Sequence, residues 1–138
     1  MARSTPFVQK LYDESFSLLV EARNYFAYSG FNDKTAHTPR ERLLLNYQAM
    51  RLTSRMTQVM AWMLAQRAID NGELTPQQAC DGTYSLGAET VCIDASDHDD
   101  PRLPDGLREL LHRSHSMYMR VLRLDEAART KLTDEREH

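Results

Sequence analysis

The segment from Arg42 to Gly72 constrains the fold of this chain more than any other. At helical spacing it is apolar on most of its circumference, whereas a one-sided surface helix carries a single apolar stripe. One apolar row consists of Leu43, Tyr47, Met50, Thr57, Ala61, Leu64 and Ala68, and another of Leu45, Ala49, Leu52, Met56, Val59 and Met63. Such a helix must be covered from more than one side, by other helices of the chain, by a second subunit or by both. We therefore expect it to be the central helix of a small bundle.

The composition predicts one soluble domain of ordinary character. The chain has 138 residues, of which 41% are hydrophobic and 27% charged, and it can bury a core without disulfides or a structural metal. A net charge of -3 and a pI near 5.9 argue against a dedicated binder of nucleic acid or of anionic membranes. The polar start has no signal-sequence pattern, and no apolar run approaches the roughly 18 residues of a membrane span. We expect a cytoplasmic protein.

The fold class that we predict is all-α, an antiparallel three-helix bundle with a long central helix. Apolar residues at helical spacing place the helices at about 6–29, 39–71 and 104–128. A long loop over 72–103 precedes the third helix. Residues 1–128 then form a single domain, and 129–138 a disordered, flexible C-terminal tail, because that segment contains one large apolar residue among many charges.

Start and stop signals support these boundaries. Thr5 and Pro6 are suited to the first helix start, and Gly30 to its end. Thr38 and Glu41 flank a proline in a capping-box pattern, in which the Thr38 hydroxyl accepts from the Glu41 amide and Glu41 reaches back. Gly72 can take the left-handed conformation that ends the central helix.

The loop before the third helix is acidic. Residues 81–101 contain six acidic residues and no lysine or arginine. The run Thr90 to Ile93 is apolar and is expected to pack onto the bundle, whereas Thr75 is expected to start only about one turn of helix. Loops of about 20 residues are unusual in compact domains and are often functional or mobile.

Residue types that carry chemistry occur, but not at the spacings that chemistry needs. The acidic loop contains carboxylates and a histidine, yet it lacks the register of an EF-hand, so we interpret it as solvated. His112 and His115 share a helix face without a third ligand motif. Cys80 and Cys92 have no base at a recognisable spacing. The loop residues in question are Asp94, Asp97, His98, Asp99 and Asp100. We predict no catalytic residue, no metal and no cofactor.

The central helix also carries candidates for protein binding. Methionines at 50, 56, 60 and 63 surround Trp62, and methionine is common on surfaces that adapt to several partners. Core packing is the alternative for this stripe, and Trp62 is a candidate interface anchor. Arg51 and Arg55, one turn apart, could form a polar strip with Gln58 and Gln66, for which ordinary solvation is the alternative.

Three segments together resemble the alphaproteobacterial family named for RcdA, the regulator of CtrA degradation. The first helix contributes LYDE from Leu11 and EARNYF from Glu21. The central helix contributes RLTSRMTQV from Arg51, continuing through Trp62 to QRA from Gln66. The third helix contributes SMYMRVLRLD from Ser116. The resemblance covers the three helices, which are most of the chain.

The resemblance implies a three-helix bundle that forms a homodimer and acts as a non-enzymatic adaptor for the ClpXP protease. Such adaptors help to deliver cell-cycle regulators, such as CtrA, to a protease already primed by a receiver-domain adaptor, and they gather at a cell pole. The partner-binding residues that we predict lie in the second and third motifs: Arg51, Arg55, Gln58, Trp62, Gln66, Arg67, Arg120 and Arg123.

A DNA-associated or transcriptional regulator is the alternative function. It would use Arg51 and Arg55 together with Arg120 and Arg123 to bind phosphates. The acidic balance of the chain disfavours it. An enzyme with a metal at His98, or at His112 and His115, is a third class that metal analysis can test.

Overall fold

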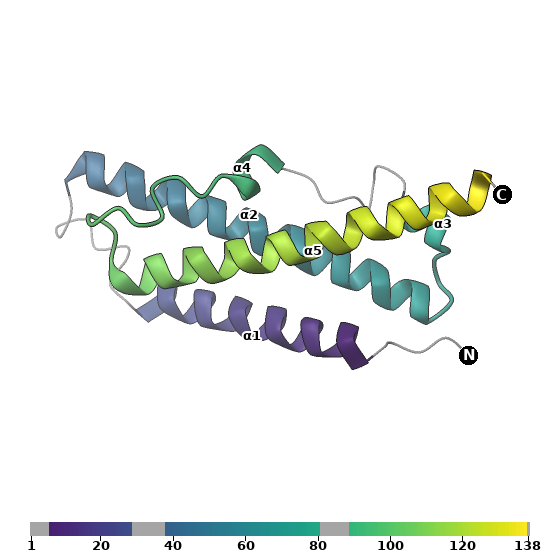
Figure 1. Cartoon of the computed structure of the whole chain (residues 1–138). Helices are drawn as coiled ribbons and strands as arrows, with labels where there is room; N and C mark the ends of the chain where they lie inside the picture. Colours follow the sequence, from purple (N-terminus) through teal and green to yellow (C-terminus); the bar gives the residue numbers. More distant parts are fainter. Residues whose placement is uncertain (1–5, 29–37, 81–88, 138) are drawn as a thin grey trace.

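The computed structural model describes residues 6–28, 38–80 and 89–137, and every regular element among them is a helix. The three long helices are α1 (Pro6–Tyr28), α2 (Pro39–Asp70) and α5 (Asp105–Glu137), and the two short ones are α3 (Pro76–Ala79) and α4 (Glu89–Ile93). The long helices form an elongated bundle (Figure 1). The all-α prediction is confirmed. The expected signals at Thr5 and Gly30 lie outside the described residues, as do residues 81–88 of the acidic loop.

Local sequence signals set the ends of α2. The Thr38 hydroxyl accepts from the Glu41 amide over 3.1 Å, as predicted, but the Glu41 carboxylate contacts the Thr38 hydroxyl over 3.1 Å. A complete capping box occurs instead at α3, where Thr75 and Gln78 each bond the other's amide. Gly72, with φ of 77°, follows the C-cap of α2 and takes the left-handed conformation predicted for it.

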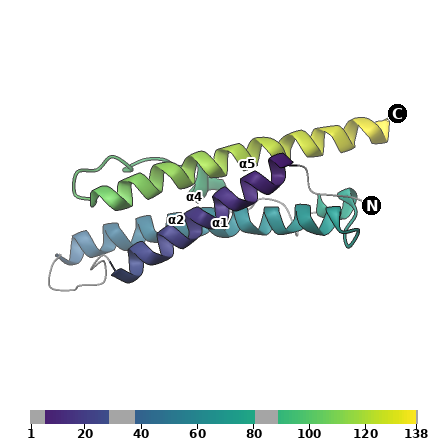
Figure 2. The ribbon, with the colours of Figure 1, turned by 90° about the horizontal axis from the view of Figure 1, so that it is seen from below.

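The helix directions differ in one respect from the prediction. Helix α1 runs antiparallel to both α2 and α5, but α2 and α5 run parallel to each other (Figures 1 and 2). Two hydrogen bonds show this parallel arrangement, because Arg55 contacts Ser114 and, further along both helices, Trp62 contacts Asp125. The connection between the two helices is long enough to return along the bundle, as in bundles with a crossover connection.

The pair of α2 and α5 is covered on two sides. Helix α1 packs on one side, and α4 with the segment after it packs on the other (Figure 1). The core that results is mainly aliphatic and sulfur-containing: Leu11, Leu18, Leu45, Leu52, Met56, Val59, Met63, Leu107, Leu111, Met117, Tyr118 and Val121 are among its buried members. The expectation that α2 must be covered from more than one side is therefore met within the chain itself.

The C-terminal segment differs from the predicted flexible tail. Helix α5 continues through residues 129–137 and ends at Glu137. Arg129 connects this extension to the rest of the protein: its Nε donates to the Asp125 carboxylate over 2.9 Å and its Nη1 to the Cys80 carbonyl over 3.0 Å. The residues that follow include Lys, Leu, Arg and Glu, which are good helix formers, so local propensity and this anchor outweigh the shortage of apolar residues.

Candidate functional site

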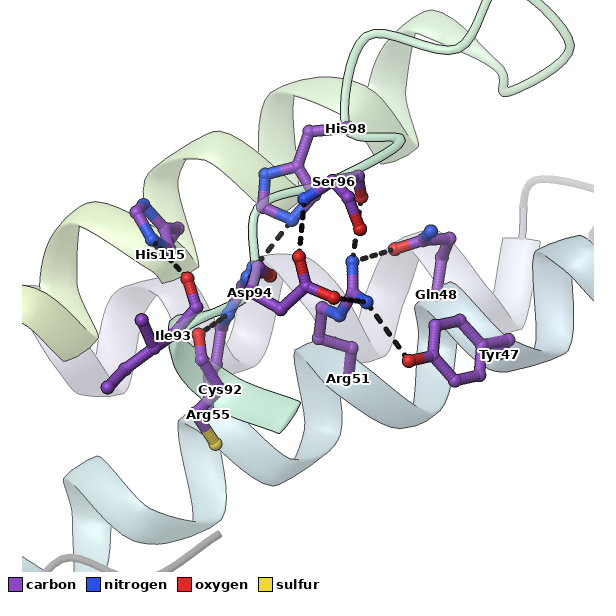
Figure 3. Close-up of polar contacts among 10 residues, drawn as sticks. All are labelled: Tyr47, Gln48, Arg51, Arg55, Cys92, Ile93, Asp94, Ser96, His98 and His115. Atoms are coloured by element: carbon purple, nitrogen blue, oxygen red, sulfur yellow. Dashed lines mark hydrogen bonds and ion pairs between the residues drawn. The ribbon is translucent and has the colours of Figure 1, made fainter. Parts of the chain in front are cut away.

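Arg51 and Arg55 lie side by side in the interior, one turn apart on α2 (Figure 3). Their exposed fractions are 1% and 0%, so they form no solvated strip. Burying a charged group is costly unless hydrogen bonds replace the lost water. The acceptors come from the segment 92–98, which crosses over the two arginines, and from α5 and α2 itself.

Arg55 binds main-chain oxygens from two different elements. Its Nε donates to the Cys92 carbonyl over 2.9 Å and its Nη2 to the Asp94 carbonyl over 2.8 Å. Its Nη1 donates to the Leu111 carbonyl over 3.0 Å and to the Ser114 hydroxyl over 3.2 Å. Burial, and secondly the neighbouring Arg51, lower the pKa of Arg55 to about 10, so it stays protonated at neutral pH.

Arg51 pairs with the one carboxylate of this cluster. Its Nη2 lies 3.0 Å from Oδ2 of Asp94, and its Nη1 donates to the Ser96 carbonyl over 2.9 Å and to Gln48 over 3.2 Å. The pKa of Asp94 is lowered, chiefly because its carboxylate accepts from the Ser96 backbone amide. Asp94 therefore remains ionised opposite Arg51.

His98 completes the cluster and corrects the interpretation of the acidic loop as simply solvated. Its side chain is only 1% exposed, and its Nε2 lies 3.0 Å from Nη2 of Arg55. A guanidinium can only donate, so Nε2 accepts and His98 is neutral in this arrangement. Burial, and then the charges of Arg55 and Arg51, lower the pKa of His98 to about 4.

Three histidines gather at this point, but two arginines stand behind them. The His98 ring lies 5.4 Å from the His112 ring and 5.7 Å from the His115 ring, centre to centre. His112 contacts Asp99, and His115 contacts the Ile93 carbonyl. Within residues 6–28, 38–80 and 89–137, no group of His, Cys, Asp or Glu is arranged to hold a metal ion.

This arrangement fixes a chain segment and offers no reacting group. The guanidiniums are occupied by carbonyls and a carboxylate of the same chain, which places α4 and the segment after it on the α2–α5 pair. The contribution of Cys92, Asp94 and His98 was not visible in the sequence, because their partners lie about 40 residues away with no periodic signal. The clue available was the pair of arginines within an otherwise apolar helix.

Trp62 is buried and hydrogen-bonded, not an exposed anchor. Its exposed fraction is 6%, and its Nε1 donates to Asp125 over 3.1 Å. Gln58 and Gln66 are partly buried on the same helix, and Gln66 lines a pocket of about 260 Å³ between α2, α3 and α5. Arg67 is exposed, with its guanidinium 4.8 Å from the centre of the Tyr12 ring.

The arginines predicted on α5 face different surroundings. Arg120 is half-buried and pairs with Glu14 of α1 over 3.0 Å, which supports the contact between these helices. Arg123 is exposed. The eight predicted partner-binding residues are therefore not one surface: Arg51, Arg55 and Trp62 are interior, whereas Arg67 and Arg123 face solvent.

Large apolar side chains are exposed on α1 and α2. On α1 these include Phe7, Phe16 and Tyr28, with exposed fractions of 54%, 50% and 83%. On α2 they include Leu43 and Leu64, at 72% and 55%. Contiguous apolar surface of this kind marks protein contacts more often than catalysis. None of the described helices is long and apolar enough to cross a membrane.

Comparison with known proteins gives two findings. The family model described as "Protein of unknown function (DUF1465)" matches residues 1–138. The crystal structure of RcdA from Caulobacter crescentus CB15 is 32% identical in sequence, with a TM-score of 0.70 over 92% of this chain and 93% of that one. A search of curated proteins found no match. The resemblance stated from three motifs is confirmed, and the chain belongs to the DUF1465 family as an RcdA-like protein.

Proposed function

We propose that this protein is a non-enzymatic adaptor that helps to deliver cell-cycle regulators, such as CtrA, to the ClpXP protease. The observation that carries the proposal is the similarity to RcdA in both sequence and structure over nearly the whole of both chains. By the same resemblance it acts as a homodimer in the cytoplasm, concentrated at a cell pole. A fluorescent fusion tests the location.

An adaptor of this kind accelerates degradation without bond chemistry. It binds cargo and the protease machinery together and so raises the effective concentration of cargo at the protease. Two features of the structure support this role. Apolar side chains exposed on α1 and α2 offer contact surface, and the buried arginine pair fixes the helices and the segment 92–98 in one arrangement.

The exposed arginines are the direct partner contacts in this proposal. Arg67 and Arg123 face solvent, and the partly buried Gln58, Gln66 and Arg120 stand beside them on α2 and α5. The buried predicted residues, Arg51, Arg55 and Trp62, would affect partner binding through the fold. Exposed and buried variants should therefore differ in whether stability changes along with delivery.

A reconstituted degradation assay tests the function. A CtrA-like substrate and ClpXP are incubated with the priming receiver-domain adaptor, with and without this protein. We expect faster loss of substrate only when this protein is present. We expect Arg67→Glu and Arg123→Glu to reduce the acceleration, whereas Arg23→Glu, an exposed position on α1, should not. No acceleration with any candidate cargo would refute the adaptor function.

The DNA-associated alternative has lost the surface that it needed. Arg51 and Arg55 are buried, and Arg120 is paired with Glu14. Only Arg123 of the four arginines is freely exposed as that hypothesis requires. Duplex binding at low salt, weakening steeply as salt is added, would revive it.

A further inference from the structure

One row of α2 residues has the spacing of a coiled-coil seam. From Leu43 to Ala68 its positions advance by alternating steps of four and three, which is the heptad repeat. Its apolar members are Leu43, Tyr47, Met50, Ala61, Leu64 and Ala68, and Ser54 and Thr57 occupy the centre. We call this row the outer seam of α2.

The outer seam faces away from the core of its own chain. Leu43, Met50 and Leu64 are 72%, 51% and 55% exposed, whereas Leu52 and Val59, on the opposite side of the helix, are 1% and 0% exposed. No position of the seam between 43 and 68 carries a charge. An uncharged, apolar row along most of a 32-residue helix is unusual for a surface that meets only water.

Large and small residues are distributed about the centre of the seam in a complementary way. In an antiparallel pair with a two-fold axis between Ser54 and Thr57, Leu43 of one copy faces Ala68 of the other. In the same register Met50 faces Ala61. Each large side chain therefore meets a small one, as close packing requires. In a parallel pair each residue would face itself, and Leu43 and Met50 would crowd while Ala61 left a gap.

Charge at the ends of the seam favours the same direction. Arg40 is exposed and continues the row three positions before Leu43. Antiparallel pairing places it beside the C-terminal end of the other α2, where Asp70 and the negative end of the helix dipole lie. Parallel pairing would bring Arg40 against its own copy.

One seam residue is held in place before any partner arrives. The Tyr47 hydroxyl accepts from Nη2 of Arg51 over 3.1 Å, and the Arg51 guanidinium lies 4.9 Å from the centre of the Tyr47 ring. A side chain that is fixed beforehand loses less conformational entropy on binding. In the antiparallel register Tyr47 packs against Leu64 of the other copy.

We propose that the outer seam of α2 binds the outer seam of a second copy in antiparallel register, with the two-fold axis between Ser54 and Thr57. The inference rests on the proposed function only in that the adaptor acts as a homodimer. It adds the face, the direction and the register, and a homodimer interface of this form uses the same patch on both copies.

Cysteine crosslinking tests the register directly. In a Cys80→Ser background, which removes the partly exposed native thiol, Met50→Cys and Ala61→Cys proteins are oxidised separately and as an equal mixture. Only the mixture should yield a disulfide-linked dimer, because only residues 50 and 61 of different copies face each other closely enough. Crosslinking of Met50→Cys alone to the same extent, or no crosslink in the mixture, would overturn the register.

Light scattering coupled to size exclusion tests the face. We expect Leu64→Glu to convert the dimer into a monomer with unchanged helical circular dichroism. Ile93→Glu, at an apolar α4 residue that is 39% exposed, should leave the dimer intact. A wild-type monomer, or a dimer that Leu64→Glu does not weaken, would refute the seam. A dimer that fails to accelerate degradation would instead refute the adaptor function and leave the seam standing.

Discussion

The Nε of Arg55 donates to the carbonyl oxygen of Cys92 over 2.9 Å and so joins the middle of α2 to the end of α4. The same guanidinium reaches the carbonyls of Asp94 and Leu111. One side chain thereby holds three separately folded parts of the chain together. Arginine suits this position because its planar fork of donors can serve several acceptors at fixed angles, which a lysine ammonium cannot.

Replacing Arg55 should destabilise the protein strongly. Arg55→Met fills much of the same volume but leaves the Cys92 and Asp94 carbonyls without their donor. We expect a loss of about 3 kcal/mol in the free energy of unfolding, measured by urea denaturation, since buried acceptors that lose their partners are costly. Arg123→Met on the exposed face of α5 is the control and should change stability by less than about 0.5 kcal/mol. Equal effects of the two substitutions would contradict the role assigned to Arg55.

The sequence could place the two arginines on one face but could not say which face. Residues 51 and 55 are one helical turn apart, so their proximity follows from helix geometry alone. Their burial depends on carbonyl oxygens of residues 92, 94 and 96, which lie in a stretch whose acidic composition indicates exposure. Backbone acceptors have no residue signature, so this cluster could be recognised only in three dimensions.

Mild acid should destabilise the protein through His98. Its pKa is lowered from 6.5 to about 4 in the folded state, mainly by burial, so the folded protein favours the neutral ring. The stability that this contributes is complete above pH 6.5 and is lost as the pH falls from there towards 4. Between pH 7.5 and 5 we expect the free energy of unfolding to fall by roughly 2 kcal/mol from this group. His115, whose pKa burial also lowers, acts in the same direction.

A variant at His98 separates this effect from general acid sensitivity. In His98→Gln the amide oxygen can still accept from Arg55, but the side chain does not titrate. Its free energy of unfolding should depend less on pH over the same interval, which stays above the range in which Asp94 is protonated. An unchanged pH dependence in this variant would rule out His98 as the titrating group.

Helices and caps were predictable here, whereas helix direction and length were not. The Thr38 and Gly72 signals act within one helical turn, so they depend on neighbours in sequence. The parallel pairing of α2 and α5 depends on how the 71–104 connection crosses the bundle, which no local signal states. The helical C-terminus depends on Arg129, whose acceptor Cys80 lies 49 residues earlier.

Truncation should separate the two parts of the C-terminal extension. Removing residues 130–138 keeps the Arg129 contacts with Asp125 and Cys80, whereas removing 129–138 loses both. We expect both proteins to stay helical, but only the shorter one to lose about 1–2 kcal/mol in the free energy of unfolding. Emission from Trp62, the only tryptophan, should change with it, because Asp125 bonds both Trp62 and Arg129.

The same truncations test the role of this segment in delivery. Loss of 129–138 should weaken degradation of at least some cargo in the reconstituted assay. Arg129→Met in the full-length chain is the matched variant, since it removes the anchor but keeps the remaining residues. Unchanged delivery of every cargo by the shortest protein would remove the segment from the adaptor mechanism.

Gly106 marks a close approach between α1 and α5. A Cβ atom added there would lie 2.7 Å from Cε2 of Tyr25, so the aromatic ring would have to move. Alanine improves helix propensity by up to about 1 kcal/mol, but overpacking typically costs about 1–3 kcal/mol. We expect Gly106→Ala to lower the free energy of unfolding by about 1 kcal/mol, as measured by urea denaturation.

A double-mutant cycle identifies the cause of that loss. Tyr25→Leu removes the ring, so Gly106→Ala should cost less in that background, and the two changes should be non-additive. Gly72→Ala is the contrasting control, because nothing lies within 4 Å of its added Cβ but its φ of +77° is strained for alanine. Its cost should be the same with Tyr25 or Leu at position 25. Additive effects at positions 25 and 106 would show that the ring does not set the helix contact, and that Gly106 is needed for another reason.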